Sequence, residues 1–83
     1  MNQPENKVEP TLYQRIIAEV RPYLGNQADE FIRRQCLHIK VAPEKLEKKD
    51  MESLAYWIGS SAKLLLSRDT ANLLRQRITA LGE

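Results

Sequence analysis

Apolar residues recur every three or four positions along most of the chain after residue 10, a spacing typical of amphipathic helices. The first apolar stripe runs from Thr11, a suitable N-cap, to Gly25, a suitable residue to end a helix. Its members are Tyr13, Ile16, Ile17, Val20 and Leu24. Pro22 removes one helical hydrogen bond, so we expect a kink there and a break at Gly25. A break at Arg21, with Pro22 opening the next helix, fits the same apolar phase.

A second stripe predicts a helix that begins after Asn26, which can serve as its N-cap. The apolar members of this stripe are Ala28, Phe31, Ile32, Cys36 and Ile39. Acidic residues lie in its first turn and basic residues later, which suits the helix dipole. Residues 38–42 are expected to be a connector. Pro43 is then expected to open a short helical turn over residues 43–48.

The third helix is expected to begin at Asp50 as its N-cap and to occupy the centre of the domain. Its stripe consists of Met51, Leu54, Ile58, Ala62 and Leu65, and a second stripe of Trp57 and Leu64 flanks it. An apolar arc this wide predicts more than one neighbour. We expect Gly59 to lie in an unbroken helix where a neighbour packs closely, with Ser60 and Ser61 bonding back to carbonyls.

The last helix is expected to start at Ser67 to Asp69 and to end at Gly82. Its apolar face is made by Ala71, Leu74, Ile78 and Leu81. No segment alternates between apolar and polar residues, so no strands are expected. The sequence thus predicts an all-α fold, a small bundle of four main helices (four to five with the short turn), orthogonal or up-down. Residues 1–10 are polar and contain two prolines, which predicts a disordered tail before a single domain over residues 11–83.

Two segments resemble each other at an offset of 34 residues: YLGNQADEFIRR from Tyr23 and WIGSSAKLLLSR from Trp57. The offset equals the length of a tetratricopeptide repeat. That family's signature also requires an aromatic residue three positions after the glycine, where this chain has Ala28 and Ala62. No family is therefore assigned, and shared helix-packing constraints explain the likeness as well as duplication does.

The composition of the chain argues against a disulfide-linked, secreted or membrane-spanning protein. A chain of 83 residues is one small domain, and its single cysteine excludes an internal disulfide, as expected in a reducing compartment. The polar first residues lack the apolar core of a signal peptide, and no apolar run approaches the roughly 20 residues of a membrane span. We therefore expect a cytoplasmic protein without a membrane partner. A net charge of +2 is too small to indicate a concentrated basic face.

The chain carries no motif expected of a catalytic, cofactor or metal site. The run Gly59 to Lys63 lacks the second glycine and the preceding strand that a phosphate loop or a hydrolase elbow requires. Cys36 and His38 are two residues apart on a helix, so they point to different faces, and no second cysteine or histidine completes a zinc site. We expect Cys36 in the core and His38 at a helix end. We expect no enzyme, no cofactor and no metal.

The aromatic side chains that cannot all enter the core favour binding to a protein partner. Tyr56 and Trp57 are adjacent on a helix, so only one of them can point fully into the core. Aromatic residues are enriched at protein interfaces. The candidate partner surface comprises Tyr13, Tyr23, Tyr56, Trp57 and Leu64. The sequence predicts a protein-interaction or regulatory adaptor domain, with self-association through Trp57 as one form of it.

The alternative function is DNA or RNA binding through the helix over residues 67–81. Its exposed face carries residue types that contact bases and phosphates. The candidate contacts are Arg33, Arg34, Arg68, Asn72 and Arg75. Against this reading, Asp69 lies at the helix start, where phosphates would approach, and the preceding turn lacks the usual glycine.

Overall fold

The computed structural model describes residues 11–83, and the tail predicted over residues 1–10 lies outside the described residues. The described part consists entirely of helices and connections. The α-helices are α1 (Leu12–Leu24), α2 (Ala28–Ile39), α3 (Met51–Ala62) and α4 (Arg68–Ala80). Three short 3-10 helices, η2 (Gly25–Gln27), η3 (Pro43–Lys45) and η4 (Lys48–Asp50), lie between them.

The all-α class agrees with the sequence, but the predicted architecture of four to five helices is wrong in its helix count. Residues 11–83 contain seven helical segments, and what was expected as one short turn over residues 43–48 is two 3-10 helices. Segments of three residues contain too few positions to produce an apolar period, so periodicity cannot reveal them.

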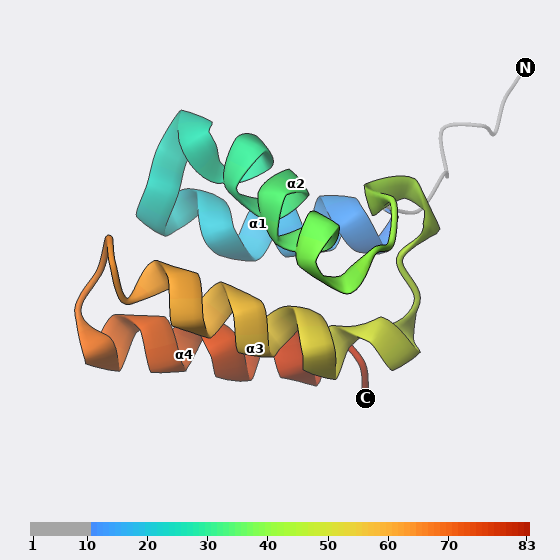
Figure 1. The fold of residues 1–83 in the computed structure, drawn as a ribbon. Coiled ribbons are helices and arrows are strands. Elements are labelled where there is room, and N and C mark those ends of the chain that lie inside the picture. Colours follow the sequence, from blue (N-terminus) through green and yellow to red (C-terminus); the bar gives the residue numbers. More distant parts are fainter. Residues whose placement is uncertain (1–10) are drawn as a thin grey trace, which may run out of the picture.

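The helices form two layers, each a hairpin of antiparallel helices (Figure 1). One hairpin consists of α1 and α2, and the other of α3 and α4. The layers meet because α3 packs on α2 and α4 packs on α1. The last described residues return to the start of α3, where Gly82 lies so close that an added Cβ would be 2.8 Å from the Lys48 carbonyl oxygen. No helix within residues 11–83 combines the length and the apolar content needed to cross a bilayer.

The first helix begins and ends at the predicted residues. Thr11 and Gln14 form a capping box, in which each side chain accepts a hydrogen bond from the backbone N–H of the other. Pro22 lies inside the last turn of α1, and the helix ends at Gly25, whose φ of 58° is strained for any residue with a side chain. The break at Gly25 is confirmed, and the alternative break at Arg21 is wrong.

Two predicted N-caps do not cap. Asn26 lies inside η2, and the N-cap position of α2 is taken by Gln27 without a side-chain hydrogen bond. Asp50 occupies the predicted N-cap position of α3, but its carboxylate accepts the Glu47 N–H at the start of η4 and makes no capping hydrogen bond to α3. Ser67 does cap α4, since its hydroxyl accepts the Thr70 N–H at 3.1 Å.

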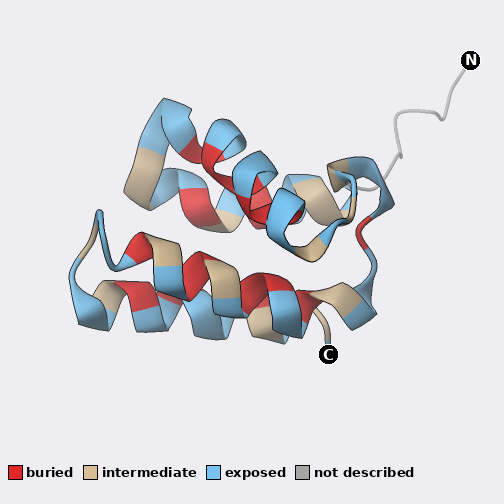
Figure 2. Cartoon of the chain, viewed as in Figure 1, coloured by how far each residue is buried: buried red, intermediate tan, exposed pale blue. Residues whose placement is uncertain are grey.

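The buried residues lie along the facing sides of the two layers (Figure 2). They follow the predicted stripes, and the fully buried large members are Ile16, Val20, Ile32, Met51, Leu54, Ile58, Leu74 and Ile78. Cys36 is buried among them, as predicted. Leu65 was expected in the stripe of the third helix but is 58% exposed. The reason is that α3 ends at Ala62, so the helical phase no longer applies at residue 65.

Gly59 lies in unbroken helix and is buried against α4, as predicted. A Cβ added there would lie 3.2 Å from Cδ and 3.3 Å from Cβ of Arg75. Gly25 instead terminates its helix, so the two glycines of the 34-residue likeness occupy different structures, and the likeness is not a structural repeat. The serine prediction is wrong for Ser61, which donates its hydroxyl to the Gln35 side chain on α2.

Candidate functional site

Four side chains from three helices form a stacked row, consisting of His38, Trp57, Tyr56 and Arg75. The His38 ring on α2 stacks on the Trp57 indole of α3, with centroids 4.2 Å apart and planes 7° from parallel. Tyr56 meets Trp57 edge-on at 5.6 Å and 84°. The Arg75 guanidinium of α4 lies 6.0 Å from the centre of the Tyr56 ring. The stacked row therefore crosses the surface from one helical hairpin to the other.

Local sequence explains why the row passes through α3. Adjacent residues of an α-helix point about 100° apart. Trp57 can therefore face α2 while Tyr56 faces α4. Gly59 lies three positions after Tyr56, on the side that meets α4, and the Arg75 side chain lies directly over it. The missing side chain of Gly59 is thus what lets Arg75 reach the Tyr56 ring.

A partly buried hydrogen bond joins α2 and α3 one turn from the His38–Trp57 stack. Gln35 is 2% exposed and is the buried polar side chain of the described core. Its Oε1 accepts the Ser61 hydroxyl at 2.9 Å. A buried amide that has a hydrogen-bond partner destabilises the fold little, whereas the same amide without a partner destabilises it strongly. The bond to Ser61 therefore fixes the relative register of the two helices.

A second polar cluster joins α1 to α2. The Tyr13 hydroxyl donates to the Asp29 carboxylate, and the Arg33 Nε donates to the same carboxylate at 3.0 Å. Burial, followed by the hydrogen bond to Asp29, raises the pKa of Tyr13 to about 12. The hydrogen bond from Tyr13, followed by that from Arg33, lowers the pKa of Asp29. The cluster stabilises the turn between α1 and α2 and occupies the polar group of Tyr13.

The predicted partner surface is only partly brought together. Tyr56, which is 54% exposed, and the half-buried Trp57 are neighbours in the stacked row. Tyr13 and Tyr23 are half-buried and pack against the core. Leu64 is 86% exposed but lies past the end of α3 in the connection to α4. The five residues therefore do not form one surface. Only Tyr56 and Trp57 are neighbours, and both belong to the stacked row.

The predicted nucleic-acid contacts fall into two groups on different helices. Arg33 pairs with Asp29 and Arg34 pairs with Glu30 at 3.3 Å, so the charges on α2 are locally neutralised. The other three, Arg68, Asn72 and Arg75, lie on α4. Asn72 and Arg75 line a shallow hollow of about 500 Å³ together with Gln76, Thr79 and Glu83. The arginines on α2 and the residues on α4 therefore do not form one continuous basic surface.

Sequence reasoning missed two members of the site. His38 was expected only as a helix end, and it does lie in the last turn of α2, but its stacking partner is 19 positions away. Gln35 carried no local signal of burial. Within residues 11–83, no three metal-ligating side chains come together. Burial raises the pKa of the Cys36 thiol to about 11, which makes it a poor nucleophile at neutral pH.

Comparison with known proteins gives the chain no family. No protein-family model matches it, and no curated protein or solved structure is significantly similar to it.

Proposed function

We propose that the chain is a cytoplasmic, non-catalytic protein-interaction domain that binds its partner through the stacked row. The row is the observation that carries this proposal, because it places Trp, Tyr and Arg side by side. These three residue types dominate the energetically important positions of protein interfaces. The single buried cysteine supports a reducing compartment.

The chemistry of the row defines the kind of partner it fits. The Tyr56 ring and the stacked His38–Trp57 pair offer flat, largely apolar surfaces. Arg75 forms no ion pair within residues 11–83, so its charge is available beside those rings. A partner segment with an apolar side chain next to a carboxylate would satisfy both ends of the row.

Capture of partners by the full-length chain tests the proposal, with proteins identified by mass spectrometry and their affinity then measured. Tyr56→Ala is expected to weaken binding at least about tenfold, since truncating a central aromatic residue of an interface typically has that effect. Leu73→Ala is the matched control, because Leu73, like Tyr56, is a large exposed side chain, but it lies on α4 and outside the row. Equal binding by wild type and Tyr56→Ala would refute the row as the binding surface.

Nucleic-acid binding is the second candidate, and one observation favours it: Asn72, Gln76 and Arg75 share a hollow on α4. These residues could contact a phosphate backbone or base edges. The candidate predicts an affinity that falls steeply with salt and an Arg75→Ala variant that binds more weakly with a smaller salt slope. Unchanged affinity in Arg75→Ala and Arg68→Ala would eliminate it.

A further inference from the structure

The hollow on α4 adjoins the stacked row and shares Arg75 with it. This α4 hollow, of about 500 Å³, is lined by Asn72, Arg75, Gln76, Thr79 and Glu83. The Arg75 guanidinium carbon also lies 6.0 Å from the centre of the Tyr56 ring, which is exposed. A ligand that occupies the hollow and binds Arg75 therefore reaches the aromatic part of the row as well.

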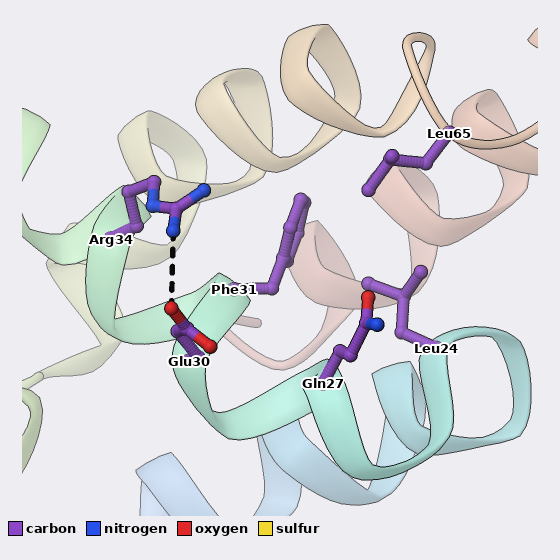
Figure 3. Close-up of a pocket in the computed structure, with 6 residues that line it drawn as sticks. All are labelled: Leu24, Gln27, Glu30, Phe31, Arg34 and Leu65. Carbon is purple, nitrogen blue, oxygen red and sulfur yellow. Dashed lines mark hydrogen bonds and ion pairs between the residues drawn. The ribbon is translucent and has the colours of Figure 1, made fainter.

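The polar side chains of the α4 hollow are available to a ligand. Figure 3 shows the contrasting case, a hollow of about 310 Å³ beside α2, where Glu30 and Arg34 on the rim already pair with each other at 3.3 Å. In the α4 hollow, Arg75 forms no ion pair within the described part of the chain. The amides of Asn72 and Gln76 form no side-chain hydrogen bond there either. One charge and two amides thus remain for a partner to satisfy.

Asn72 and Gln76 have the chemistry and the spacing to bind the main chain of a peptide. A carboxamide carries a donor and an acceptor, so it can pair with the C=O and the N–H of a peptide chain. The two residues are four positions apart on α4, which is a rise of about 6.0 Å. An extended chain presents main-chain groups in the same direction at every second residue, about every 6.6 Å. An extended segment that runs along α4 therefore meets both amides.

The Arg75 guanidinium and the Tyr56 ring have the spacing of two side chains on one face of such a segment. The guanidinium carbon and the ring centre are 6.0 Å apart, and side chains on the same face of an extended chain repeat about every 6.6 Å. A carboxylate suits the guanidinium, and an apolar side chain suits the flat ring. The surface thus fits an acidic residue and an apolar residue that are two positions apart.

We infer that the partner bound by the stacked row is an extended peptide segment with this pattern of one acidic and one apolar residue. The inference rests on the proposed function and deepens it, because it names the conformation and the side chains of the partner. A helical partner would repeat its side chains at a similar interval of about 6.0 Å, but its main-chain groups are already hydrogen-bonded within the helix. It would leave the amides of Asn72 and Gln76 without main-chain partners.

The charges around the hollow disfavour the competing occupant, a nucleic acid. Glu83 lines the hollow together with Arg75, so one carboxylate offsets the one guanidinium. Glu52 is exposed and lies four positions before Tyr56 on α3, on the same helical face. A chain of phosphates that passed along this surface would approach both carboxylates. A peptide avoids that repulsion because it can place neutral or basic residues beside them.

Selection from a displayed library of random dodecapeptides against the full-length chain tests the inference. The selected peptides are expected to share an acidic residue two positions from an apolar one. Asn72→Ala and Gln76→Ala should each weaken their binding about two- to tenfold, which is the loss expected from one hydrogen bond. Leu73→Ala is the matched control and should bind them as wild type does, since Leu73 is exposed on α4 but does not line the hollow.

Reversal of the charge at Arg75 tests the carboxylate contact through a change of preference. Arg75→Glu is expected to select peptides in which Lys or Arg replaces the acidic residue, while the apolar residue two positions away is kept. A variant that had merely lost its fold would select no peptides at all, so a switched preference reports on the contact itself. An Arg75→Glu variant that still selects acidic peptides would overturn the inference.

The other outcomes distinguish failure of the inference from failure of the proposed function. Peptides whose acidic and apolar residues are four positions apart, as on a helix, would overturn the inference. So would a library that yields no peptide, or tighter binding to single-stranded DNA than to any selected peptide. The proposed function survives each of these results if an identified cellular partner still requires Tyr56. Selected peptides that bind Tyr56→Ala as tightly as wild type would refute both.

Discussion

Removing the Ser61 hydroxyl should destabilise the fold far more than removing its partner, Gln35. In Ser61→Ala, the buried Gln35 amide loses its hydrogen bond at 2.9 Å yet stays 2% exposed. A buried polar group left without a partner costs about 1–3 kcal/mol. In Gln35→Met, by contrast, an apolar side chain of similar length fills the site, and the half-buried Ser61 can bond to water instead. This second change should alter the free energy of unfolding by less than about 1 kcal/mol.

Thermal and urea unfolding followed by circular dichroism measure both effects. For a domain of this size, 1 kcal/mol corresponds to a shift in Tm of about 4–8 °C. Ser61→Ala should therefore melt at least about 4 °C below wild type, with an unchanged urea m-value. The double variant should regain most of the loss, because it removes both polar groups together.

Comparison of the unfolding free energies of the two single variants and the double variant shows whether the Ser61–Gln35 bond holds α2 to α3. A Ser61→Ala variant that melts with wild type would show that Gln35 finds another partner and that the bond does not hold α2 to α3. A double variant as unstable as the sum of the single ones would show that the two side chains act independently.

Four further outcomes follow from the described contacts. Cys36→Ser should lower the free energy of unfolding by about 1–3 kcal/mol, measured in urea, because it buries a hydroxyl in the core; an unchanged midpoint would contradict that burial. Gly82→Ala should destabilise measurably, because its Cβ would lie 2.8 Å from the Lys48 carbonyl oxygen, and a normal melt would show that the end of the chain does not pack there. The raised pKa of Tyr13 contributes stability that is present below pH 10 and lost as pH rises towards about 12, so wild type should lose more stability over that range than Tyr13→Phe. The lowered pKa of Asp29 acts at acid pH: the stability it contributes is lost as pH falls below 3.8 and the carboxylate becomes protonated. Unfolding of wild type and Tyr13→Phe, measured in parallel across both the alkaline and the acid range, checks the two effects.

The core could be predicted from the sequence because the signal is local. Ile58 and Leu74 are buried where the helical period places them, and Gly25 ends α1 because few other residues tolerate its backbone conformation. The prediction failed at Leu65, where the helix had already ended, and at Asp50, whose carboxylate accepts the Glu47 N–H and makes no capping hydrogen bond to α3. Both failures come from short-range backbone choices that an apolar period does not report.

The site was less predictable because its contacts join distant parts of the chain. Tyr56 and Trp57 could be selected because adjacent aromatic residues cannot both enter a core. Nothing near His38 indicates that it stacks on Trp57, since that contact depends on the antiparallel packing of α2 and α3. The sequence therefore identified the middle of the row and missed one of its ends.

Gly59 connects the predictable core with the less predictable surface. The sequence indicated that a glycine in mid-helix lets a neighbour approach, and the structure shows that the neighbour is the Arg75 stem. Any side chain at position 59 would contact that stem at about the 3.2 Å found for a Cβ, so Arg75 would have to move, and its guanidinium is the group that reaches the Tyr56 ring. Alanine would add about 1 kcal/mol of helix propensity at this position, which opposes the strain of the contact. The fold could therefore tolerate the substitution while the row loses its cation, because close packing of α3 on α4 and the chemistry of the exposed surface depend on the same missing side chain.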